Sequence, residues 1–278
     1  MKHIEYNWAD TDGQNVYAQG WEPSSAPKGV ICLVHGMFEH SGRYKHVADF
    51  YTKKGFALLA IDLKGHGKTE GQKGHIKNYD VLLNQIDQLL EKANTLYPSA
   101  PKFLYGHSMG GGLVTHYTIL RSPDVKGSIA TGPWIELAFK PPSFKLALGK
   151  MMVKLYPGYT EKSDLDVNDL SHDPSVGEAY LADPMVHDKI SSGFFFGVHN
   201  GGIWSKENIK KIKKPLLLCH GGEDKVTSWA ATEKLALDGG DLVTFKKWDK
   251  LRHEIHNEPK QKEVLSYIND WMDKLLEH

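Results

Sequence analysis

Five short apolar runs mark the chain, and each has the length and composition of a buried strand. They lie at residues 29–34, 56–61, 102–105, 128–131 and 216–219. Within each run the apolar residues are continuous rather than alternating, which is the pattern of parallel strands covered on both faces. Stretches with helical spacing separate or follow them, at residues 82–96, 111–120, 230–237 and 260–276. This alternation predicts an α/β fold, with a mostly parallel central sheet and helices on both faces.

The regular alternation breaks between residues 134 and 204. This interval contains a pair of prolines, an amphipathic stretch at 144–156, acidic loops and three consecutive phenylalanines. We interpret residues 134–204 as a helical cap, or lid, inserted into an α/β core. The core then consists of residues 1–133 and 205–278.

Apolar side chains of the amphipathic stretch allow two interpretations. They are Phe144, Leu146, Leu148, Met151, Met152 and Leu155. They either line a dry path for a fatty chain or form the core of the cap itself. If they form an exposed apolar patch, we expect the cap to touch a membrane surface transiently.

Composition narrows the class of protein. A chain of 278 residues has room for one large α/β domain with an insertion. With 34 basic and 34 acidic residues it has no net charge, which does not favour nucleic acid as a partner. Cys32 and Cys219 lie in strand-like runs, which predicts buried thiols rather than a disulfide. With a polar stretch at residues 1–13 and no apolar run of about 18 residues, we expect a cytoplasmic protein, at most peripheral to a membrane.

A candidate nucleophile lies in the pentapeptide at residues 106–110, which fits the pattern G-x-S-x-G. An apolar strand leads into it and a helical stretch follows it, as a nucleophile elbow requires. The glycines allow a sharp turn that presents the Ser108 hydroxyl, and the helix N-terminus stabilises negative charge there. Ser108 is therefore the predicted nucleophile; the alternative is a simple Gly/Ser turn that caps a helix.

A serine hydroxyl needs a base to remove its proton and an acid to orient that base. In this architecture the acid and the histidine follow the serine, in that order, after later strands. Asp224 comes after the 216–219 strand and a glycine turn, and is the predicted acid; Glu223 is the neighbouring alternative. His253 follows a further strand-like run and is the predicted base, with His256 as the alternative.

Backbone N–H groups must stabilise the oxyanion of the tetrahedral intermediate. One should come from Met109, which directly follows the nucleophile, and the other from the loop after an early strand. That loop begins His35-Gly36-Met37, so the Met37 N–H is the second predicted donor.

Three further stretches of the sequence partly match motifs for phosphate, zinc or dinucleotide binding, but none matches its motif completely. The Gly67-Lys68-Thr69 triplet lacks the earlier glycine of a P-loop, because position 62 is Asp. The His253-Glu254-Ile255-His256 run is one residue short of the zinc motif H-E-x-x-H. No G-x-G-x-x-G follows a strand. We therefore expect neither a metal nor a cofactor.

Motifs in several parts of the sequence resemble one known family. They are His35-Gly36 with residues 39–44, the stretch 62–71, the elbow at 106–111, Asp183-Pro184, His220-Gly221 with Asp224, and His253 with His256. In these motifs the chain, over about residues 29–271, resembles the α/β-hydrolases of the monoacylglycerol lipase and lysophospholipase group. Thr69 stands where that family usually has Ser. The resemblance implies an α/β-hydrolase fold with a cap.

The resemblance also implies an activity. A member of this group would hydrolyse a monoacylglycerol to fatty acid and glycerol through an acyl-enzyme, with a small lipid ester as its partner. The positions matching Glu39, Arg43 and His256 would bind the glycerol end, unless Glu39 and Arg43 form a structural ion pair behind the oxyanion loop. The alternatives are a lysophospholipase, a general carboxylesterase, and a non-catalytic binding protein of the same fold.

Overall fold

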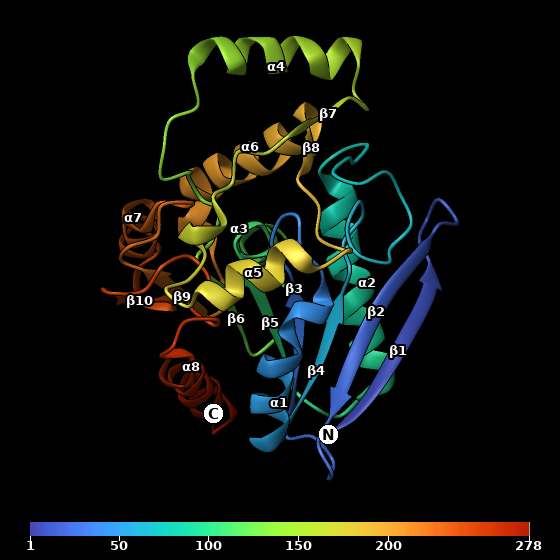
Figure 1. Ribbon diagram of the computed structural model, residues 1–278. Helices are drawn as coiled ribbons and strands as arrows, with labels where there is room; N and C mark the ends of the chain where they lie inside the picture. Colours follow the sequence, from blue (N-terminus) through green and yellow to red (C-terminus); the bar gives the residue numbers. More distant parts are fainter. Residues whose placement is uncertain (278) are drawn as a thin grey trace.

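A computed structural model describes residues 1–277, and it contains an eight-stranded central sheet (Figure 1). The strand order is β1-β2-β4-β3-β5-β6-β9-β10. The strands are β1 Lys2–Ala9, β2 Asn15–Glu22, β3 Gly29–Val34, β4 Phe56–Ile61, β5 Lys102–His107, β6 Gly127–Thr131, β9 Leu216–Gly221 and β10 Val243–Trp248. All neighbours from β4 to β10 pair in parallel, whereas β2 is antiparallel to β1 and β4. The predicted mostly parallel sheet is confirmed.

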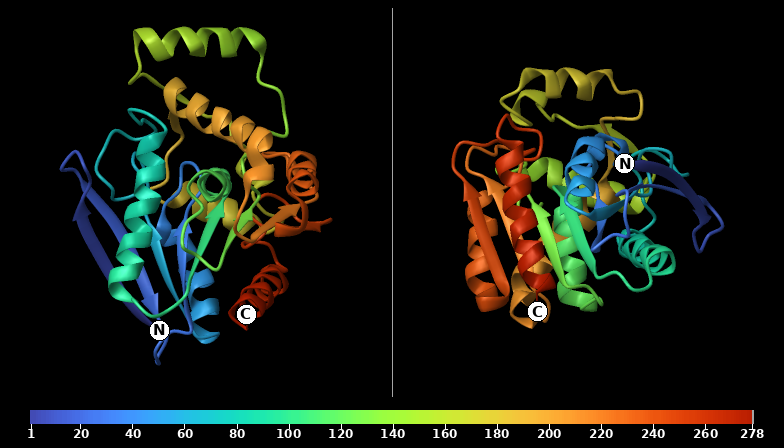
Figure 2. Two further views of the ribbon diagram at one scale, coloured as in Figure 1. Left: turned by 180° about the vertical axis from the view of Figure 1, so that it is seen from behind. Right: turned by 90° about the horizontal axis from the view of Figure 1, so that it is seen from below.

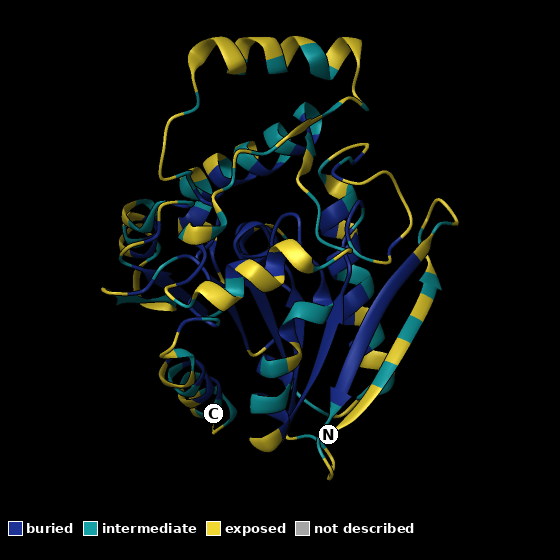
Figure 3. Cartoon of the chain, viewed as in Figure 1, coloured by how far each residue is buried: buried dark blue, intermediate teal, exposed yellow. Residues whose placement is uncertain are grey.

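The N-terminal hairpin β1–β2 was not expected from the sequence. β1 lies at the edge of the sheet, so one of its faces meets solvent and its residues alternate between exposed and half-buried (Figure 3). Polar residues therefore interrupt its apolar ones, and the strand contains no continuous apolar run. β2 lies between β1 and β4 and is buried, but Gln19 and Gly20 interrupt its apolar residues, so it contains no continuous apolar run either.

Helices cover both faces of the sheet, as predicted (Figure 2). On one face lie α1 Lys45–Lys53 and α8 Gln261–Leu276; on the other lie α2 Asp80–Leu96, α3 Met109–Arg121 and α7 Trp229–Gly239. The buried side of α2 repeats at helical spacing, because one stripe packs on the sheet. In contrast, α3 is buried on nearly all sides, since it lies between the sheet and a cap helix.

The cap helices lie beyond the carboxyl ends of the parallel strands (Figures 1 and 2). They are α4 Ser143–Leu155, α5 Pro174–Ala182 and α6 Ser192–Asn208, and a small sheet pairs β7 Thr160–Lys162 with β8 Lys189–Ser191. α6 packs on α3 and continues to Asn208, past the boundary at residue 204 expected from the sequence. The assignment of residues 134–204 as a distinct cap stays our proposal.

Helix α4 is the outermost element, and none of its residues is buried (Figure 3). The expectation that its apolar side chains form the core of the cap is therefore wrong. Four of them instead face solvent, because α4 touches the rest of the protein mainly through α6.

Short 3-10 helices complete the described structure: η1 Ser41–Tyr44, η2 Val167–Asp169, η3 Ile209–Lys211 and η4 Gly240–Leu242. Within residues 1–277, no helix combines the length and the apolar character needed to cross a bilayer. Cys32 on β3 and Cys219 on β9 are buried free thiols, as predicted. Burial raises the pKa of each to about 12, which keeps both protonated.

Candidate active site

The predicted nucleophile lies at a sharp turn between β5 and α3. Ser108 has φ of 54°, a left-handed conformation that few non-glycine residues adopt, and α3 starts at the next residue. A side chain at Gly110 would place its Cβ 2.2 Å from the carbonyl oxygen of Val34, so only glycine fits there. The Met109 N–H lies in the first turn of α3, where amides have no partner within the helix.

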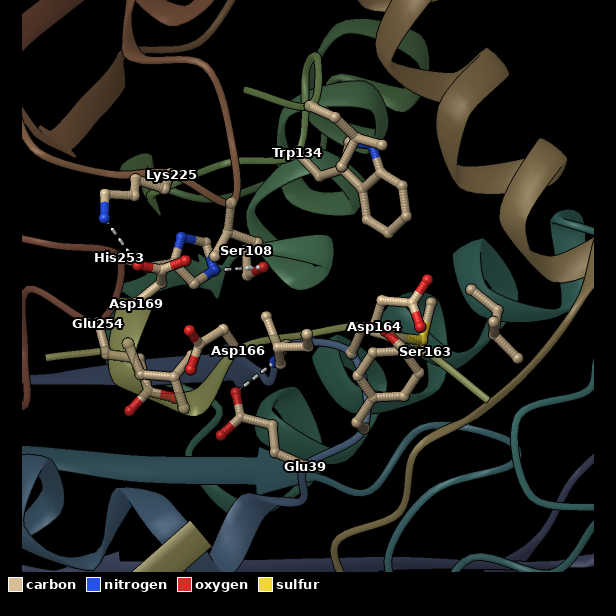
Figure 4. Close-up of a pocket in the computed structure, with 18 of the residues that line it drawn as sticks. Glu39, Ser108, Trp134, Ser163, Asp164, Asp166, Asp169, Lys225, His253 and Glu254 are labelled. Carbon is tan, nitrogen blue, oxygen red and sulfur yellow. Dashed lines mark hydrogen bonds and ion pairs between the residues drawn. The ribbon is translucent and has the colours of Figure 1, made fainter. Parts of the chain in front are cut away.

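The structure brings the three predicted catalytic side chains together, and Figure 4 shows Ser108 and His253 among the residues that line the pocket. The Ser108 Oγ lies 2.8 Å from His253 Nε2, and His253 Nδ1 lies 2.7 Å from Asp224 Oδ2. In a neutral imidazole, Nδ1–H donates to the carboxylate, which leaves Nε2 free to accept the serine hydroxyl. All three residues are buried. This arrangement suits activation of Ser108 by a general base.

Asp224 is a buried carboxylate with a full set of donors. Its Oδ2 accepts from His253, from His220 Nε2 at 3.0 Å and from Thr227 Oγ1 at 2.9 Å. Its Oδ1 accepts the backbone N–H groups of Val226 and Thr227. Burial alone would raise the pKa of Asp224, but attraction to His253 and the hydrogen bonds from both histidines hold it well below its usual value. The side chain therefore stays ionised.

Opposing effects also act on the pKa of His253, the predicted base. Burial disfavours the charged form of His253, but the nearby Asp224 outweighs this and raises the pKa of His253 overall. The ring of His107 lies 4.9 Å from that of His253. Burial lowers the pKa of His107 to about 3, so this neighbour remains neutral and adds no charge beside the base.

The alternative acid and base lie elsewhere. Glu223 is half exposed and pairs with His172 at 3.2 Å, away from the serine. His256 is buried and stacks on Tyr44, with ring centroids 5.0 Å apart. The geometry thus favours Asp224 and His253 over their neighbours.

The loop after β3 packs directly against the nucleophile. A Cβ at Gly36 would lie 3.2 Å from Cβ of Ser108, so a larger residue would push the two segments apart. The Gly36 N–H donates to Glu39 Oε1 at 2.7 Å, which closes the loop around Met37. Met37 lines the pocket beside Ser108. The loop therefore places the Met37 amide near the nucleophile, as a second oxyanion donor requires.

A buried ion cluster lies next to this loop. Arg43 Nη1 donates to Glu39 Oε2 at 2.5 Å, and Arg43 makes a two-point contact with Glu254 at 2.7 and 2.8 Å. The proximity of Arg43 outweighs burial and lowers the pKa of Glu254. Glu39 and Glu254 line the pocket, whereas Arg43 and His256 do not. The ion pair of Glu39 and Arg43 considered from the sequence is therefore present, and a direct substrate contact finds no support for Arg43 or His256.

A cavity of about 450 Å³ opens above Ser108. Its apolar lining includes Trp134, Leu137, Phe139, Leu165, Leu170, Ile190, Phe195 and Val226. Trp134 and Glu39 lie on opposite sides of Ser108, so the pocket has an apolar side and a carboxylate side (Figure 4). Helix α4 contributes no residue to this cavity, whereas its Leu146, Met151 and Val153 line a separate hollow against α6, so a path lined by α4 stays an expectation.

Sequence reasoning missed several lining residues. Tyr180 of α5 lines the pocket, and its hydroxyl is buried with no hydrogen-bond partner among residues 1–277. Glu254 directly follows His253, and this adjacency to the base was the only feature of the sequence that could have indicated its place in the pocket. For Trp134 and Tyr180 the sequence contains no such feature, because their place in the pocket depends on the path of the cap. The described residues contain no group of three or more His, Cys, Asp or Glu arranged to hold a metal.

Comparison with known proteins agrees with this geometry. The profile of the family described as serine aminopeptidase, S33, matches residues 25–260. A monoacylglycerol lipase of Mycolicibacterium smegmatis is 32% identical over 271 residues, which is 96% of each chain. An uncharacterized abhydrolase domain-containing protein of Dictyostelium discoideum is 32% identical over 98% of this chain, but the match spans only 29% of that longer protein.

A solved structure shows the same architecture over the full length. The monoacylglycerol lipase of Paleococcus ferrophilus is 29% identical, with a TM-score of 0.83 and 100% of both chains covered. The resemblance inferred from the motifs is thereby confirmed. The chain belongs to the serine aminopeptidase S33 family, and within this family to the α/β-hydrolases of the monoacylglycerol lipase group, which are carboxylic ester hydrolases.

Proposed function

We propose that this protein hydrolyses monoacylglycerols to fatty acid and glycerol, using Ser108, His253 and Asp224. The observation that carries the proposal is the hydrogen-bonded chain of these three side chains at the base of a pocket with one apolar and one carboxylate side. The names of the full-length relatives support the substrate class, since those proteins are monoacylglycerol lipases.

The first half of the reaction forms an acyl-enzyme. Ser108 Oγ attacks the ester carbonyl carbon while His253 Nε2 takes its proton, and Asp224 stabilises the resulting imidazolium. The N–H groups of Met37 and Met109 donate to the oxyanion, and one such donor contributes about 3–4 kcal/mol to transition-state stabilisation. The intermediate then collapses, the bond to the glycerol oxygen breaks, and His253 returns its proton to that oxygen.

The second half repeats these steps with water. His253 takes a proton from a water molecule, whose oxygen attacks the acyl carbon. Collapse of the second intermediate breaks the bond to Ser108 Oγ, which regains its proton from His253. The fatty acid leaves and the resting enzyme is restored.

The two sides of the pocket suit the two ends of the substrate. The apolar side can bury an acyl chain, with about 0.8 kcal/mol gained for each methylene removed from water. On the other side, the carboxylates of Glu39 and Glu254 can accept hydrogen bonds from glycerol hydroxyls. The two carboxylates share the single charge of Arg43, so this side repels a phosphodiester. A neutral glycerol head group therefore fits better than the head group of a lysophospholipid.

Turnover of a panel of lipid esters tests this function. We expect monoacylglycerol to be a better substrate than lysophosphatidylcholine, and Ser108→Ala to abolish turnover of both while the protein stays folded. A fluorophosphonate probe should label the wild type and Ser175→Ala, an exposed serine of α5, but not Ser108→Ala. Labelling of Ser108→Ala would refute the assignment of the nucleophile, and absence of turnover with all esters would favour a binding protein.

We further propose that α4 rests on an anionic membrane surface from which the substrate is drawn. Its most exposed apolar side chains are Phe144, Leu148, Met151 and Leu155, which are 70, 46, 49 and 59% exposed. Residues 139–156 also contain four lysines and no acidic residue, although the whole chain has no net charge. An exposed apolar stripe flanked by lysines is typical of helices that lie in a membrane interface.

Vesicle sedimentation tests the membrane contact. We expect binding to vesicles that contain phosphatidylglycerol and weaker binding to pure phosphatidylcholine. The double variant Leu148→Glu/Met151→Glu should lose this binding and retain turnover of a water-soluble ester. Leu237→Glu, at a leucine of α7 that is 77% exposed, serves as the control and should bind like the wild type. Equal binding by the double variant and the control would exclude α4 as the contact.

A further inference from the structure

The cap touches the oxyanion loop at two points, both shortly after Met37 in the chain. The His40 Nε2 donates to Asp183 Oδ2 at 2.8 Å. The backbone N–H of His187 donates to the carbonyl oxygen of Phe38 at 3.1 Å. Asp183 directly follows α5 and His187 comes four residues later, so both contacts come from one short segment of the cap.

The hydrogen bonds around His40 define which nitrogen carries its proton. The Gly42 N–H donates to His40 Nδ1 at 3.1 Å, so Nδ1 is an acceptor. Nε2 therefore carries the hydrogen and donates it to Asp183. The second oxygen of Asp183 accepts the Met185 N–H at 2.9 Å, which fixes the carboxylate in place. The contact needs only an acceptor at position 183 and a neutral imidazole at position 40.

The loop needs support on this side because its backbone is strained. Phe38 has φ of 72°, a left-handed conformation that an aromatic residue adopts only when its surroundings impose it. On the core side, Glu39 holds the loop through the Gly36 N–H and through Tyr44, whose hydroxyl donates to Glu39 Oε1 at 2.6 Å. The cap segment supplies the restraints on the other side.

We infer that Asp183 is a positioning residue for the oxyanion hole, acting through His40. The cap then does more than enclose the substrate: by holding Phe38 and His40, it aims the adjacent Met37 N–H at the developing oxyanion. This inference rests on the proposed function, because it takes Met37 as an oxyanion donor. A purely structural role for Asp183 would instead affect folding and substrate binding alike.

The test separates transition-state stabilisation from ground-state binding. Four quantities are measured for Asp183→Ala: kcat and KM for a monoacylglycerol, the Kd of a 1-O-alkyl glycerol ether that cannot be attacked, and the Ki of a long-chain trifluoromethyl ketone. Ser108 adds to this ketone to form a charged hemiketal that occupies the oxyanion hole. Loss of a whole donor costs about 100- to 1,000-fold in kcat, so a misaimed donor should cost about 10- to 100-fold.

We expect kcat and the affinity for the ketone to fall by the same factor, while KM and the Kd of the ether change by less than about twofold. Asp183→Asn keeps an acceptor for His40 but turns its amide NH2 toward the Met185 N–H, so it should restore both quantities only in part. Asp188→Ala, which removes an exposed carboxylate one residue beyond His187, is the matched control and should leave both unchanged.

Two outcomes would overturn the inference. One is an unchanged ketone Ki in a folded Asp183→Ala. The other is a parallel loss of ketone and ether binding, which indicates a structural role. If Asp183→Ala does not fold, His40→Phe tests the same contact from the core side, because it keeps a ring without the donor. Ser108→Ala reports on the proposed function separately: if that variant is inactive and Asp183→Ala is normal, only the positioning role fails.

Discussion

At the scale of single residues, the pKa of His253 reflects a balance between burial and nearby carboxylates, of which Asp224 has the largest effect. Burial disfavours its imidazolium form, and the Asp224 carboxylate 2.7 Å away favours it more strongly, so its pKa lies above the ordinary 6.5. Asp224 can exert this effect because five hydrogen bonds keep it ionised in a buried place. The acid thus determines both the tautomer and the basicity of the base.

This balance predicts the pH dependence of the reaction. The base must be neutral to accept the proton of Ser108, so kcat/KM should fall as the pH drops through the pKa of His253, with a midpoint above 6.5. In Asp224→Asn the largest charge that opposes burial is lost, and only the weaker attraction of Glu254 and Glu39 remains. The midpoint should then move to lower pH than in the wild type, and kcat should fall by about 10⁴-fold. Rate profiles between pH 4 and pH 9 measure both effects.

Glu223→Gln is the control for this experiment. It removes the adjacent carboxylate, which is half exposed and pairs with His172 rather than with the base. Its profile should match that of the wild type. A profile of Asp224→Asn that keeps the wild-type midpoint would contradict the proposed source of the raised pKa.

At the scale of elements, the turn from β5 into α3 packs closely against the end of β3. Gly110 allows the first turn of α3 to approach the end of β3, and that contact places the oxyanion loop against the nucleophile. The elbow therefore depends on the absence of a Cβ at this position. Sequence reasoning could find this element because strand, glycine turn and helix are contiguous along the chain.

Gly110→Ala should damage both activity and stability. Its Cβ would lie 2.2 and 2.4 Å from the carbonyl oxygens of Val34 and His35, which cannot move without displacing the oxyanion loop. We expect a loss of at least about 100-fold in kcat, comparable to loss of an oxyanion donor. Gly193→Ala in α6 is the control, since nothing lies within 4 Å of the added atom. A Gly110→Ala enzyme with normal turnover would show that the loop adapts.

At the scale of the whole molecule, Arg43 joins three distant segments. It pairs with Glu39 of the oxyanion loop and with Glu254 beside the base, and its guanidinium lies 4.8 Å from the ring of Tyr180 in the cap. The burial of these groups makes the pairing essential, because each carboxylate would otherwise be an unpaired buried charge. The cluster therefore couples the stability of the fold to the geometry of the site.

Arg43→Leu should lower the free energy of unfolding by about 3–5 kcal/mol, the usual cost of removing one partner of a buried ion pair. Arg121→Leu, which breaks a partly exposed pair with Asp87, should cost about 1 kcal/mol or less. Denaturant titrations of the two variants give this comparison directly. Similar losses in both would show that the Arg43 cluster is no more important than a surface pair.

The sequence alone determined the features that are local or strongly periodic. The interior strands follow from continuous apolar runs, because both of their faces are covered. Ser108, Asp224 and His253 could each be chosen from its place after a strand, since parallel strands bring such turns to one edge of the sheet. The hairpin β1–β2 was missed because β1 is half exposed and because Gln19 and Gly20 interrupt the apolar residues of the buried β2.

Tertiary structure decided whatever depends on contacts between distant segments. Only the folded chain shows that α4 leaves its apolar stripe in solvent, that Glu254 shares Arg43 with Glu39, and that Asp183 reaches His40. These contacts depend on how the cap packs over the sheet. Local residue patterns do not predict that packing, because it brings together segments that are far apart in the sequence. A sequence pattern therefore identified the chemistry of the site, while the fold determined which groups surround and position it.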